Sequence, residues 1–338
     1  MNTASKPATR LLTQRDVRAV LDIEGCIGAV EQAFRQHAAG HASRPGVLAT
    51  YVEGGGFHVK SAAVAGERRH YAAKVNANFP GNLRSNGLPT IQGVVVLLDA
   101  TNGAPLAIMD SIEITRLRTA ATTALAARHL ARSDSRRVMM IGCGAQALSH
   151  IRAIGAVRPI ERLRLFDIEP DRAEALAHSA RISFGVAAEA VDDYRRAARE
   201  SDIVVTCTPS RAPLLGLDDL VPGVFVAAVG ADSEDKQEID PHSLAGCVVV
   251  VDILEQCAAI GELHHAIEAG VMTTADVRGD LGAVVSGACR GRVSNEERIV
   301  FDSTGTALQD VAAAAIAYER ACTHGIGTLI TLADEEDI

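Results

Sequence analysis

Aromatic residues are scarce in this 338-residue chain, which has no tryptophan and only 3% aromatic residues in all. This scarcity argues against stacking platforms of the kind that bind nucleic-acid bases. Basic residues are also outnumbered, because 33 Lys and Arg face 42 Asp and Glu, for a formal net charge of −9. The acidic balance and the lack of a basic tract argue against non-specific binding to nucleic acids.

Long apolar runs are missing as well. No segment approaches the length that spans a bilayer, and the first residues lack the apolar core of a signal peptide. The seven cysteines form no C-x-x-C pair, which is typical of buried, reduced thiols. His264 and His265 follow Glu262 without the H-E-x-x-H spacing, so we predict no metal site. We expect a cytoplasmic protein without nucleic-acid or membrane partners.

The distribution of apolar residues indicates two kinds of fold along the chain. The hydrophobic fraction of 48% and the length are those of a globular protein with two domains. Residues 47–109 have the pattern of a strand meander with glycine turns. From residue 137 strands alternate with helices, which predicts an α/β fold with a doubly wound parallel sheet. An Ala-rich helix from residue 307 is expected to pack back on the first domain.

Residues 138–147 carry the strongest signal for a ligand. They have the pattern of a buried strand, a tight glycine turn and the start of a helix. Gly142 permits the turn, and Gly144 lets the backbone approach a diphosphate. A second strand ends in Asp167, whose carboxylate suits ribose hydroxyls and repels a 2′-phosphate, although Arg172 nearby would soften that preference. We predict an NAD(H) site, and the competing interpretation is an α/β domain with an empty turn.

Three polar residues are candidates for chemistry, and each has a structural alternative. Lys74 lies in an apolar strand, where it would bind an anionic substrate or extend from a strand edge into water. Arg118 lies among small residues on the helix that leads to the second domain. Its planar guanidinium group would bind a carboxylate or form an interdomain ion pair. Asp232 ends a strand-like run, where it would act as acid or base or cap a helix.

Six short segments together resemble the ornithine cyclodeaminase/μ-crystallin family over nearly the full length. They are residues 74–82, 87–90, 117–121, 142–147, 230–232 with Lys236, and 301–305. The resemblance implies an N-terminal α/β substrate-binding and dimerisation domain and an NAD-binding Rossmann domain. We expect these to be residues 1–125 with 319–338, and residues 126–318, respectively. It also implies a homodimer and a reaction at a C=N group next to a carboxylate.

The resemblance further implies roles for individual residues. Lys74, Arg118 and Arg44 would hold the α-carboxylate, and Asp232 would stand at the reacting nitrogen. In ornithine cyclodeaminases a Glu thirteen residues before the strand lysine holds the distal ammonium of the substrate. That position here is Ser61, which suits a short side chain or a second carboxylate better. The predicted cofactor contacts are Thr119, Gly142, Gly144, Ala145, Gln146, Asp167, Thr206 and Ser303.

We therefore expect an NADH-dependent reductase of a small α-imino acid, equivalently an amino-acid dehydrogenase, with iminosuccinate as one candidate substrate. Lys74 and Asp232 would be catalytic, and Ser61, with His58 or Lys60, would select the substrate side chain. The alternative is an ornithine cyclodeaminase, which forms proline and ammonia. A third hypothesis is a non-catalytic, crystallin-like binder of cofactor or ligand. The joint presence of Lys74, Arg118 and Asp232 argues against that third hypothesis.

Overall fold

The computed structural model describes residues 8–65 and 69–332. The chain divides into two compact units. The N-terminal unit is Met1–Arg118 with Thr306–Ile338, and the C-terminal unit is Thr119–Gly305. The first boundary falls inside helix α4 (Ser111–Leu130), and the second precedes helix α12 (Ala307–His324). Both boundaries lie earlier in the chain than expected. The second does so because all of α12, including the first turn that contacts strand β4, belongs to the N-terminal unit.

The N-terminal unit is built on a seven-stranded sheet with the order β17-β1-β6-β5-β4-β3-β2. Strands β2 to β6 form an antiparallel meander, β1 is parallel to β6, and β17 is antiparallel to β1. The strands are β1 (Thr9–Leu12), β2 (Gly46–Val52), β3 (Gly55–Ala65), β4 (Arg69–Asn78), β5 (Ile91–Asp99), β6 (Pro105–Asp110) and β17 (Thr328–Ile330). Besides α12 and the start of α4, the helices are α1 (Gln14–Val20), α2 (Ile23–Ala38) and α3 (Asn82–Ser85).

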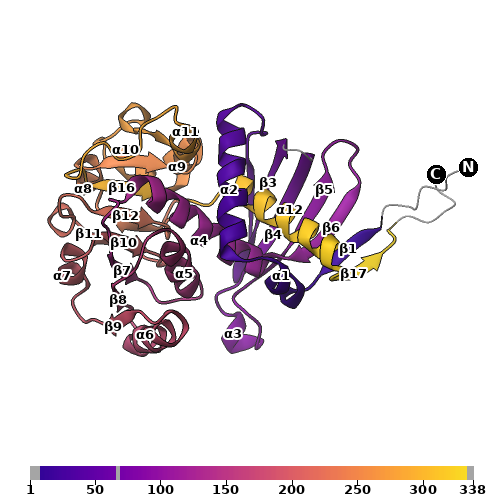
Figure 1. Ribbon diagram of the computed structural model, residues 1–338, viewed down its shortest axis with the longest axis horizontal. Helices are drawn as coiled ribbons and strands as arrows, with labels where there is room; N and C mark the ends of the chain where they lie inside the picture. Colours follow the sequence, from indigo (N-terminus) through magenta and orange to yellow (C-terminus); the bar gives the residue numbers. More distant parts are fainter. Residues whose placement is uncertain (1–7, 66–68, 333–338) are drawn as a thin grey trace, which may run out of the picture. The chain divides into compact units, whose positions relative to one another are not determined.

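Helices α2 and α12 pack together, and both contact the sheet, as Figure 1 shows. The period of two in β4 sets which side chains are buried: Ala72 and Lys74 are buried, Ala73 is half-buried and Val75 is exposed. The residues of α12 that pack inward are mostly alanines, so the helix approaches the strands closely. This arrangement places Lys74 beneath the first turn of α12.

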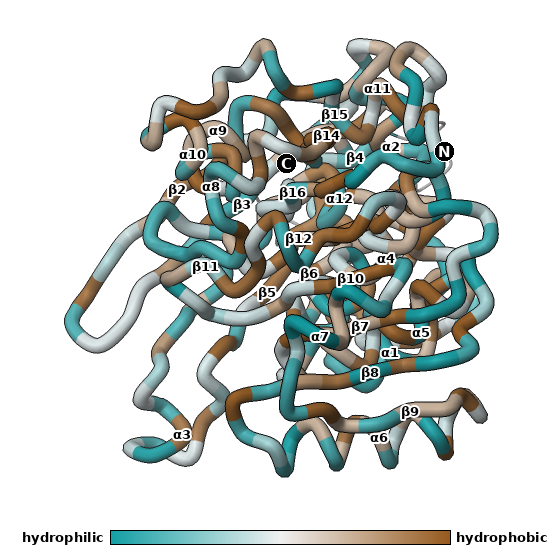
Figure 2. The backbone as a smooth tube through the Cα atoms, turned by 90° about the vertical axis from the view of Figure 1, so that its left-hand side faces the viewer, coloured by the Kyte–Doolittle hydropathy of each residue, from teal (hydrophilic) through white to brown (hydrophobic). Residues whose placement is uncertain are grey.

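The C-terminal unit contains an eight-stranded sheet with the order β15-β14-β16-β12-β10-β7-β8-β9, in which every neighbouring pair is parallel. The strands are β7 (Arg137–Ile141), β8 (Arg162–Phe166), β9 (Ala187–Ala190), β10 (Ile203–Thr206), β12 (Phe225–Ala228), β14 (Val248–Val251), β15 (Gly279–Asp280) and β16 (Ile299–Asp302). Two further strands, β11 (Arg211–Leu215) and β13 (Gln237–Ile239), pair with each other. Strands β10 and β12 are wholly buried, and the hydrophobic colour in Figure 2 follows them.

Short helices connect these strands. They are α5 (Ala147–Val157), α6 (Pro170–Phe184), α7 (Tyr194–Arg199), α8 (Pro241–Ala245), α9 (Leu254–Ile260), α10 (Glu262–Glu268) and α11 (Leu281–Ser286), with 3₁₀ turns η1 (Leu217–Asp219) and η2 (Thr274–Asp276). Within residues 8–65 and 69–332, no helix combines the length and apolar character that a membrane crossing requires.

The strand order reverses at β7, which has β8 on one side and β10 on the other. Ile141 at the end of β7 pairs with Phe166 of β8 and Thr206 of β10, so three carboxyl ends lie side by side. In doubly wound sheets, ligands bind outside the carboxyl ends of the strands at this point of reversal. The predicted α/β fold is confirmed, and its topology directs attention to the loop after β7.

Candidate active site

Helix α12 places a buried carboxylate between the two cations that the sequence analysis singled out. Asp310 Oδ1 lies 2.9 Å from Lys74 Nζ and 3.0 Å from Arg118 Nε. The side chains of Lys74, Arg118 and Asp310 are only 4%, 6% and 1% exposed. Lys74 also donates to Thr115 Oγ1 at 3.4 Å, and Arg118 Nη1 donates to Gln309 Oε1 at 2.5 Å. The structure therefore brings Lys74 and Arg118 into one cluster.

This cluster holds two formal positive charges and one negative charge out of reach of water. Burial and the neighbouring Arg118 lower the pKa of Lys74 to about 7, although Asp310 opposes the shift. Burial acts to raise the pKa of Asp310, but Lys74 and Arg118 outweigh it and hold that pKa below its usual value. Buried charge is costly unless it is matched. The surplus positive charge therefore favours a bound anion.

Two buried polar atoms of the same cluster lack hydrogen-bond partners among the described residues. They are the acceptor Asp310 Oδ2 and the donor Gln309 Nε2. Because buried polar groups are nearly always paired, this donor and acceptor are unmet hydrogen-bonding groups that a ligand with both kinds of group would satisfy. Sequence reasoning missed both residues. The available signal was two adjacent polar residues inside an Ala-rich helix.

The register of β3 and β4 determines which neighbours share a sheet face with Lys74. Lys60 is directly opposite Lys74, whereas Ser61 is opposite Ala73. Since directly opposite residues point to the same face, Lys60 lies on the face of Lys74 and Ser61 lies on the other face. The charge of Lys60 also contributes to lowering the pKa of Lys74. The predicted selector Ser61 thus points away from the cluster, and Lys60 stands beside it.

His58 and Arg44, two further predicted site residues, also differ in whether they lie near Lys74. His58 is opposite Asn76, so it shares the face of Lys74 and is half-buried there. Arg44 is exposed in the segment that precedes β2. In the part of the chain that the structure describes, no ion pair links Arg44 to Asp310. The structure therefore brings His58 and Lys60 to the face of Lys74 and leaves Arg44 outside the cluster.

The loop after β7 has the geometry of a diphosphate cradle. Gly142 has a φ of +97°, and a Cβ there would lie 2.6 Å from Cys207 O, so only glycine fits. A Cβ at Gly144 would meet nothing within 4 Å, and Gly144 and Ala145 are exposed. Gln146 precedes α5 without a side-chain cap, and its buried Oε1 has no partner among the described residues. The uncapped start of α5 therefore suits an anion.

Asp167 follows β8 and lies against this loop. Its Oδ2 accepts a 2.8 Å hydrogen bond from Cys143 N, and its Oδ1 accepts one of 3.0 Å from Glu169 N. The half-buried carboxylate keeps lone pairs for ribose hydroxyls. Arg172 forms a 2.9 Å ion pair with Glu169. Arg172, the cation expected to soften the preference against a 2′-phosphate, is thus already matched by an acid.

Three other predicted cofactor contacts are buried. Thr119 is 7% exposed on α4. Thr206 Oγ1 donates to Glu238 Oε2 at 2.6 Å, and Ser303 Oγ donates to Asp252 Oδ2 at 3.1 Å. The hydroxyls of Thr206 and Ser303 therefore bind acids of the chain at the strand ends. Sequence reasoning missed Glu238 and Asp252. Asp252 is an acid among apolar residues and could have been found, whereas Glu238 lies in a polar stretch that gives no such signal.

Asp232 lies in the loop between β12 and β13. Its side chain is 52% exposed, and its Oδ1 accepts a hydrogen bond from Lys236 Nζ at 2.5 Å. No helix begins between Asp232 and β13, so the capping alternative is wrong. The carboxylate is instead presented at the edge of the sheet where ligands bind.

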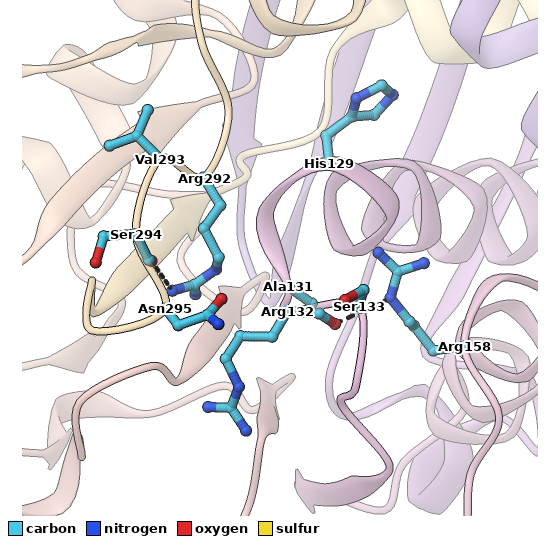
Figure 3. Close-up of a pocket in the computed structure, with 9 residues that line it drawn as sticks. All are labelled: His129, Ala131, Arg132, Ser133, Arg158, Arg292, Val293, Ser294 and Asn295. Carbon is cyan, nitrogen blue, oxygen red and sulfur yellow. Dashed lines mark hydrogen bonds between the residues drawn. The ribbon is translucent and has the colours of Figure 1, made fainter.

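A separate hollow of about 410 Å³ lies in the C-terminal unit near the end of α4 (Figure 3). Arginines line it, but Figure 3 shows their guanidinium groups pointing apart. Arg158 donates to the carbonyls of Arg128 and Arg132, and Arg292 donates to that of Leu130. These bonds satisfy two carbonyls in the last turn of α4 and one just beyond it, which is a stabilising role.

His264, His265 and Glu268 on α10 bring one potential metal-binding atom each within 4.8 Å of one another. However, His265 Nε2 is hydrogen-bonded to Lys236 O at 2.8 Å. His264 Nε2 lies 3.5 Å from the carboxylate of Glu268. These contacts engage the three side chains, and we assign no ion to them.

Comparison with known proteins identifies the family of this chain. Residues 8–325 match the model of the ornithine cyclodeaminase/mu-crystallin family. An archaeal alanine dehydrogenase dimer with bound NAD is 35% identical, with 96% of this chain and 100% of that chain covered and a TM-score of 0.91. The Thermococcus litoralis Δ¹-pyrroline-2-carboxylate reductase, in complex with NADH and L-proline, is 30% identical. That match covers 95% of this chain and 100% of the other, with a TM-score of 0.91.

The iminosuccinate reductase of Paracoccus denitrificans, in complex with NAD⁺, is also 30% identical. The match covers 96% of this chain and 100% of that chain, with a TM-score of 0.90. All three of these structures contain a nicotinamide cofactor. The resemblance found in the sequence is confirmed, and the chain belongs to the ornithine cyclodeaminase/mu-crystallin family.

Proposed function

We propose that this protein is an NAD(H)-dependent oxidoreductase that reduces a small α-imino acid to an amino acid, or catalyses the reverse reaction. The observation that carries the proposal is the buried cluster of Lys74, Arg118 and Asp310, with its surplus positive charge and its orphaned polar atoms. Similarity to pyrroline-2-carboxylate and iminosuccinate reductases supports the same reaction class.

The cluster matches the two functional groups of an α-imino acid. Its α-carboxylate would bind Lys74 and Arg118, and an anion there would favour the charged form of Lys74. Gln309 Nε2 would donate to the same carboxylate, while Asp310 Oδ2 would accept from the N–H of the substrate. A simple carboxylic acid would leave the acceptor unsatisfied. An imino or amino acid satisfies both atoms.

The C-terminal unit supplies the residues for the cofactor. Gly142, Gly144 and the start of α5 would hold the diphosphate, and Asp167 would hold the ribose. When bound, NADH supplies the hydride that reduces the C=N bond. Asp232 would manage the proton on the substrate nitrogen, because a protonated imine is the better hydride acceptor. Lys236, at 2.5 Å, would orient that carboxylate.

The residues beside the cluster favour a substrate with a second carboxylate, such as iminosuccinate. Lys60 and Lys74 are directly opposite on one sheet face, where like charges repel each other. A second carboxylate on the substrate would relieve this repulsion. A cyclodeaminase instead needs an acid for the distal ammonium of its substrate. On β3 the neighbours on this face are Lys60 and His58, and on β5 Val95 is directly opposite Lys74, so none of the three is an acid. We therefore transfer the selecting role from Ser61 to Lys60.

A row of apolar side chains on the other sheet face supports a homodimer. Leu48, Val59, Val75 and Val94 are directly opposite one another across β2 to β5. Leu48, Val75 and Val94 are 62%, 36% and 43% exposed. An exposed apolar patch of this kind is typical of an interface. We expect Val75→Glu to shift sedimentation from dimer to monomer.

The experiment follows cofactor absorbance with two sets of substrates. One set is NADH and ammonia with glyoxylate, pyruvate or oxaloacetate, together with cyclic ketimines. The other set is NAD⁺ with ornithine or lysine, assayed for ammonia and the ring product. Stoichiometric loss of NADH with the first set is the expected result. Ammonia and proline from ornithine without net change in NADH would instead establish a cyclodeaminase, and NADH binding without turnover in either set would favour the non-catalytic hypothesis.

A further inference from the structure

Glu238 joins the ends of two neighbouring strands in the C-terminal sheet. Its Oε2 accepts hydrogen bonds from Thr206 Oγ1 at 2.6 Å and from Gly230 N at 2.9 Å. Its Oε1 accepts from Thr208 N at 2.7 Å and from Thr208 Oγ1 at 2.8 Å. Thr206 ends β10, and Gly230 follows β12. One carboxylate thus ties the carboxyl ends of both strands together.

The same carboxylate is expensive to bury. Glu238 is 0% exposed, and among the described residues it takes part in no ion pair. Burial raises its pKa, although the hydrogen bonds from Thr206 and Thr208 oppose the rise. Replacing buried charge with well-packed neutral side chains is often neutral or stabilising. Stability alone therefore does not account for an acid at this position.

The location of the carboxylate connects it with the cofactor edge of the sheet. Gly142 of the diphosphate cradle is packed so closely against Cys207, which follows Thr206, that a Cβ on it would lie 2.6 Å from Cys207 O. On the other side, a Cβ at Gly230 would lie 2.4 Å from Thr208 O and 2.5 Å from Glu238 Cδ. Asp232 is two residues beyond Gly230. Glu238 therefore stands between the loop after β10 and the loop that carries Asp232.

The main chain at Glu238 is held in place by a second buried acid, Glu262. Glu262 accepts hydrogen bonds from Glu238 N at 2.8 Å and from Ile239 N at 3.0 Å. Asp302 Oδ2 accepts one from Leu263 N at 2.9 Å. The strand that bears Glu238 is thus fixed to α10, and α10 is fixed to the end of β16.

We propose that Glu238 is a positioning residue that sets the affinity for NADH and the placement of Asp232. It acts through Thr206, Thr208 and Gly230, and it need not touch cofactor or substrate. Each of its oxygens faces one main-chain N–H, which can only donate. An amide of the same size offers a single acceptor oxygen, so it cannot satisfy both.

The test is Glu238→Gln, with Asp202→Asn as the matched control. Asp202 is also a buried carboxylate that binds two main-chain amides, but it precedes β10 and so lies at the opposite end of the same strand. The dissociation constant of NADH is measured by NADH fluorescence without substrate, and thermal unfolding reports stability. The primary isotope effect with NADH deuterated at the transferred position reports hydride transfer. The binding measurement is independent of the proposed substrate class.

In Glu238→Gln we expect the dissociation constant of NADH to rise about tenfold and the isotope effect on kcat to increase, because the strand ends lose their spacing. Asp202→Asn should lower the melting temperature and leave both quantities unchanged. A folded Glu238→Gln with the wild-type dissociation constant and isotope effect would overturn the proposal.

If that variant does not fold, Thr206→Val removes one donor and keeps the carboxylate. It should weaken NADH binding about threefold, and wild-type binding there would equally overturn the proposal.

Discussion

Asp202 and Asp310 are buried carboxylates with two cationic partners each, yet their surroundings differ. Asp202 Oδ1 lies 2.8 Å from Arg132 Nη2 and 2.7 Å from Arg137 Nη2. Its Oδ2 accepts hydrogen bonds from the main-chain amides of Arg136 and Arg137 at 3.0 and 2.9 Å. In the C-terminal unit, therefore, both oxygens of the carboxylate are satisfied. In the N-terminal unit, Asp310 binds its cations through Oδ1, and its Oδ2 has no partner among the described residues.

The cationic partners of the two carboxylates also differ in how far they are exposed to water. The side chain of Arg137 is 53% exposed, so water solvates the surplus charge beside Asp202. Burial opposes ionisation of Asp202, but hydrogen bonds from Arg137 and the amides outweigh it and hold its pKa far below the usual range. Lys74 and Arg118 are almost fully buried, and the pKa of Lys74 falls to about 7. The comparison distinguishes a satisfied cluster, whose charges and hydrogen bonds are matched, from a cluster that holds surplus charge and unpaired polar atoms, as the proposed substrate site requires.

The largest effect should follow from Lys74→Met. The variant removes a buried donor to the substrate carboxylate, so we expect kcat/KM for the α-imino acid to fall at least a hundredfold. The melting temperature should stay the same or rise, because a methionine is cheaper to bury and Asp310 keeps Arg118. Steady-state kinetics and thermal unfolding of the same preparation measure both. A large loss of stability with unchanged kcat/KM would reverse the roles assigned to the two clusters.

Asp202→Asn should have the opposite profile. Loss of a satisfied, charged acceptor should cost about 2–4 kcal/mol in the free energy of unfolding, with kcat/KM of the folded enzyme unchanged. Because the folded-state pKa of Asp202 is lowered, its contribution is complete above the unfolded-state pKa of about 4 and is lost as the pH falls further. The variant should therefore lose stability at neutral pH and change less on acidification. Denaturant unfolding at pH 7 and pH 3 measures this, and equal losses at both would contradict it.

The sequence was sufficient for the fold and for the glycine turn after β7, because both depend on local pattern. Buried apolar strands alternating with helices specify a parallel sheet, and the strained turn at Gly142 requires glycine. Lys74 was found for a related reason, since a charge within an apolar strand is visible in the sequence. Gln309 and Asp310 were missed because their contact with Lys74 joins segments far apart in the chain. Nothing local in α12 indicates which strand lies beneath its first turn.

The choice between Ser61 and Lys60 also depends on a pairing between strands that the local sequence does not show. The sequence alone does not give the register in which β3 pairs with β4. A shift of one residue moves a side chain to the other face of the sheet. Counting back from Lys74 therefore cannot decide between neighbours on β3. Only the observed pairing of Lys60 with Lys74 decides it.

The lowered pKa of Lys74 should appear in the pH dependence of kcat/KM, which reports ionisation of the free enzyme. Above pH 7 the free enzyme loses the charge on Lys74, and the substrate carboxylate loses a partner. We expect kcat/KM to fall up to about tenfold per pH unit from pH 7 to pH 9. In Lys74→Arg, which stays charged, this decline should disappear even if the absolute rate is lower. An identical decline in that variant would assign it to another group.

The smallest effect should come from Lys60→Met, because Lys60 is only half-buried and water screens its charge. The variant should lower kcat/KM for oxaloacetate with ammonia about fivefold relative to pyruvate with ammonia, since only the former product has a second carboxylate. Ser61→Ala, on the other face of the same strand, is the matched control and should leave the ratio unchanged. A proportional loss with both substrates would instead make Lys60 a partner of the α-carboxylate. A changed ratio in Ser61→Ala would show that the side-chain site extends to the outer face of the sheet.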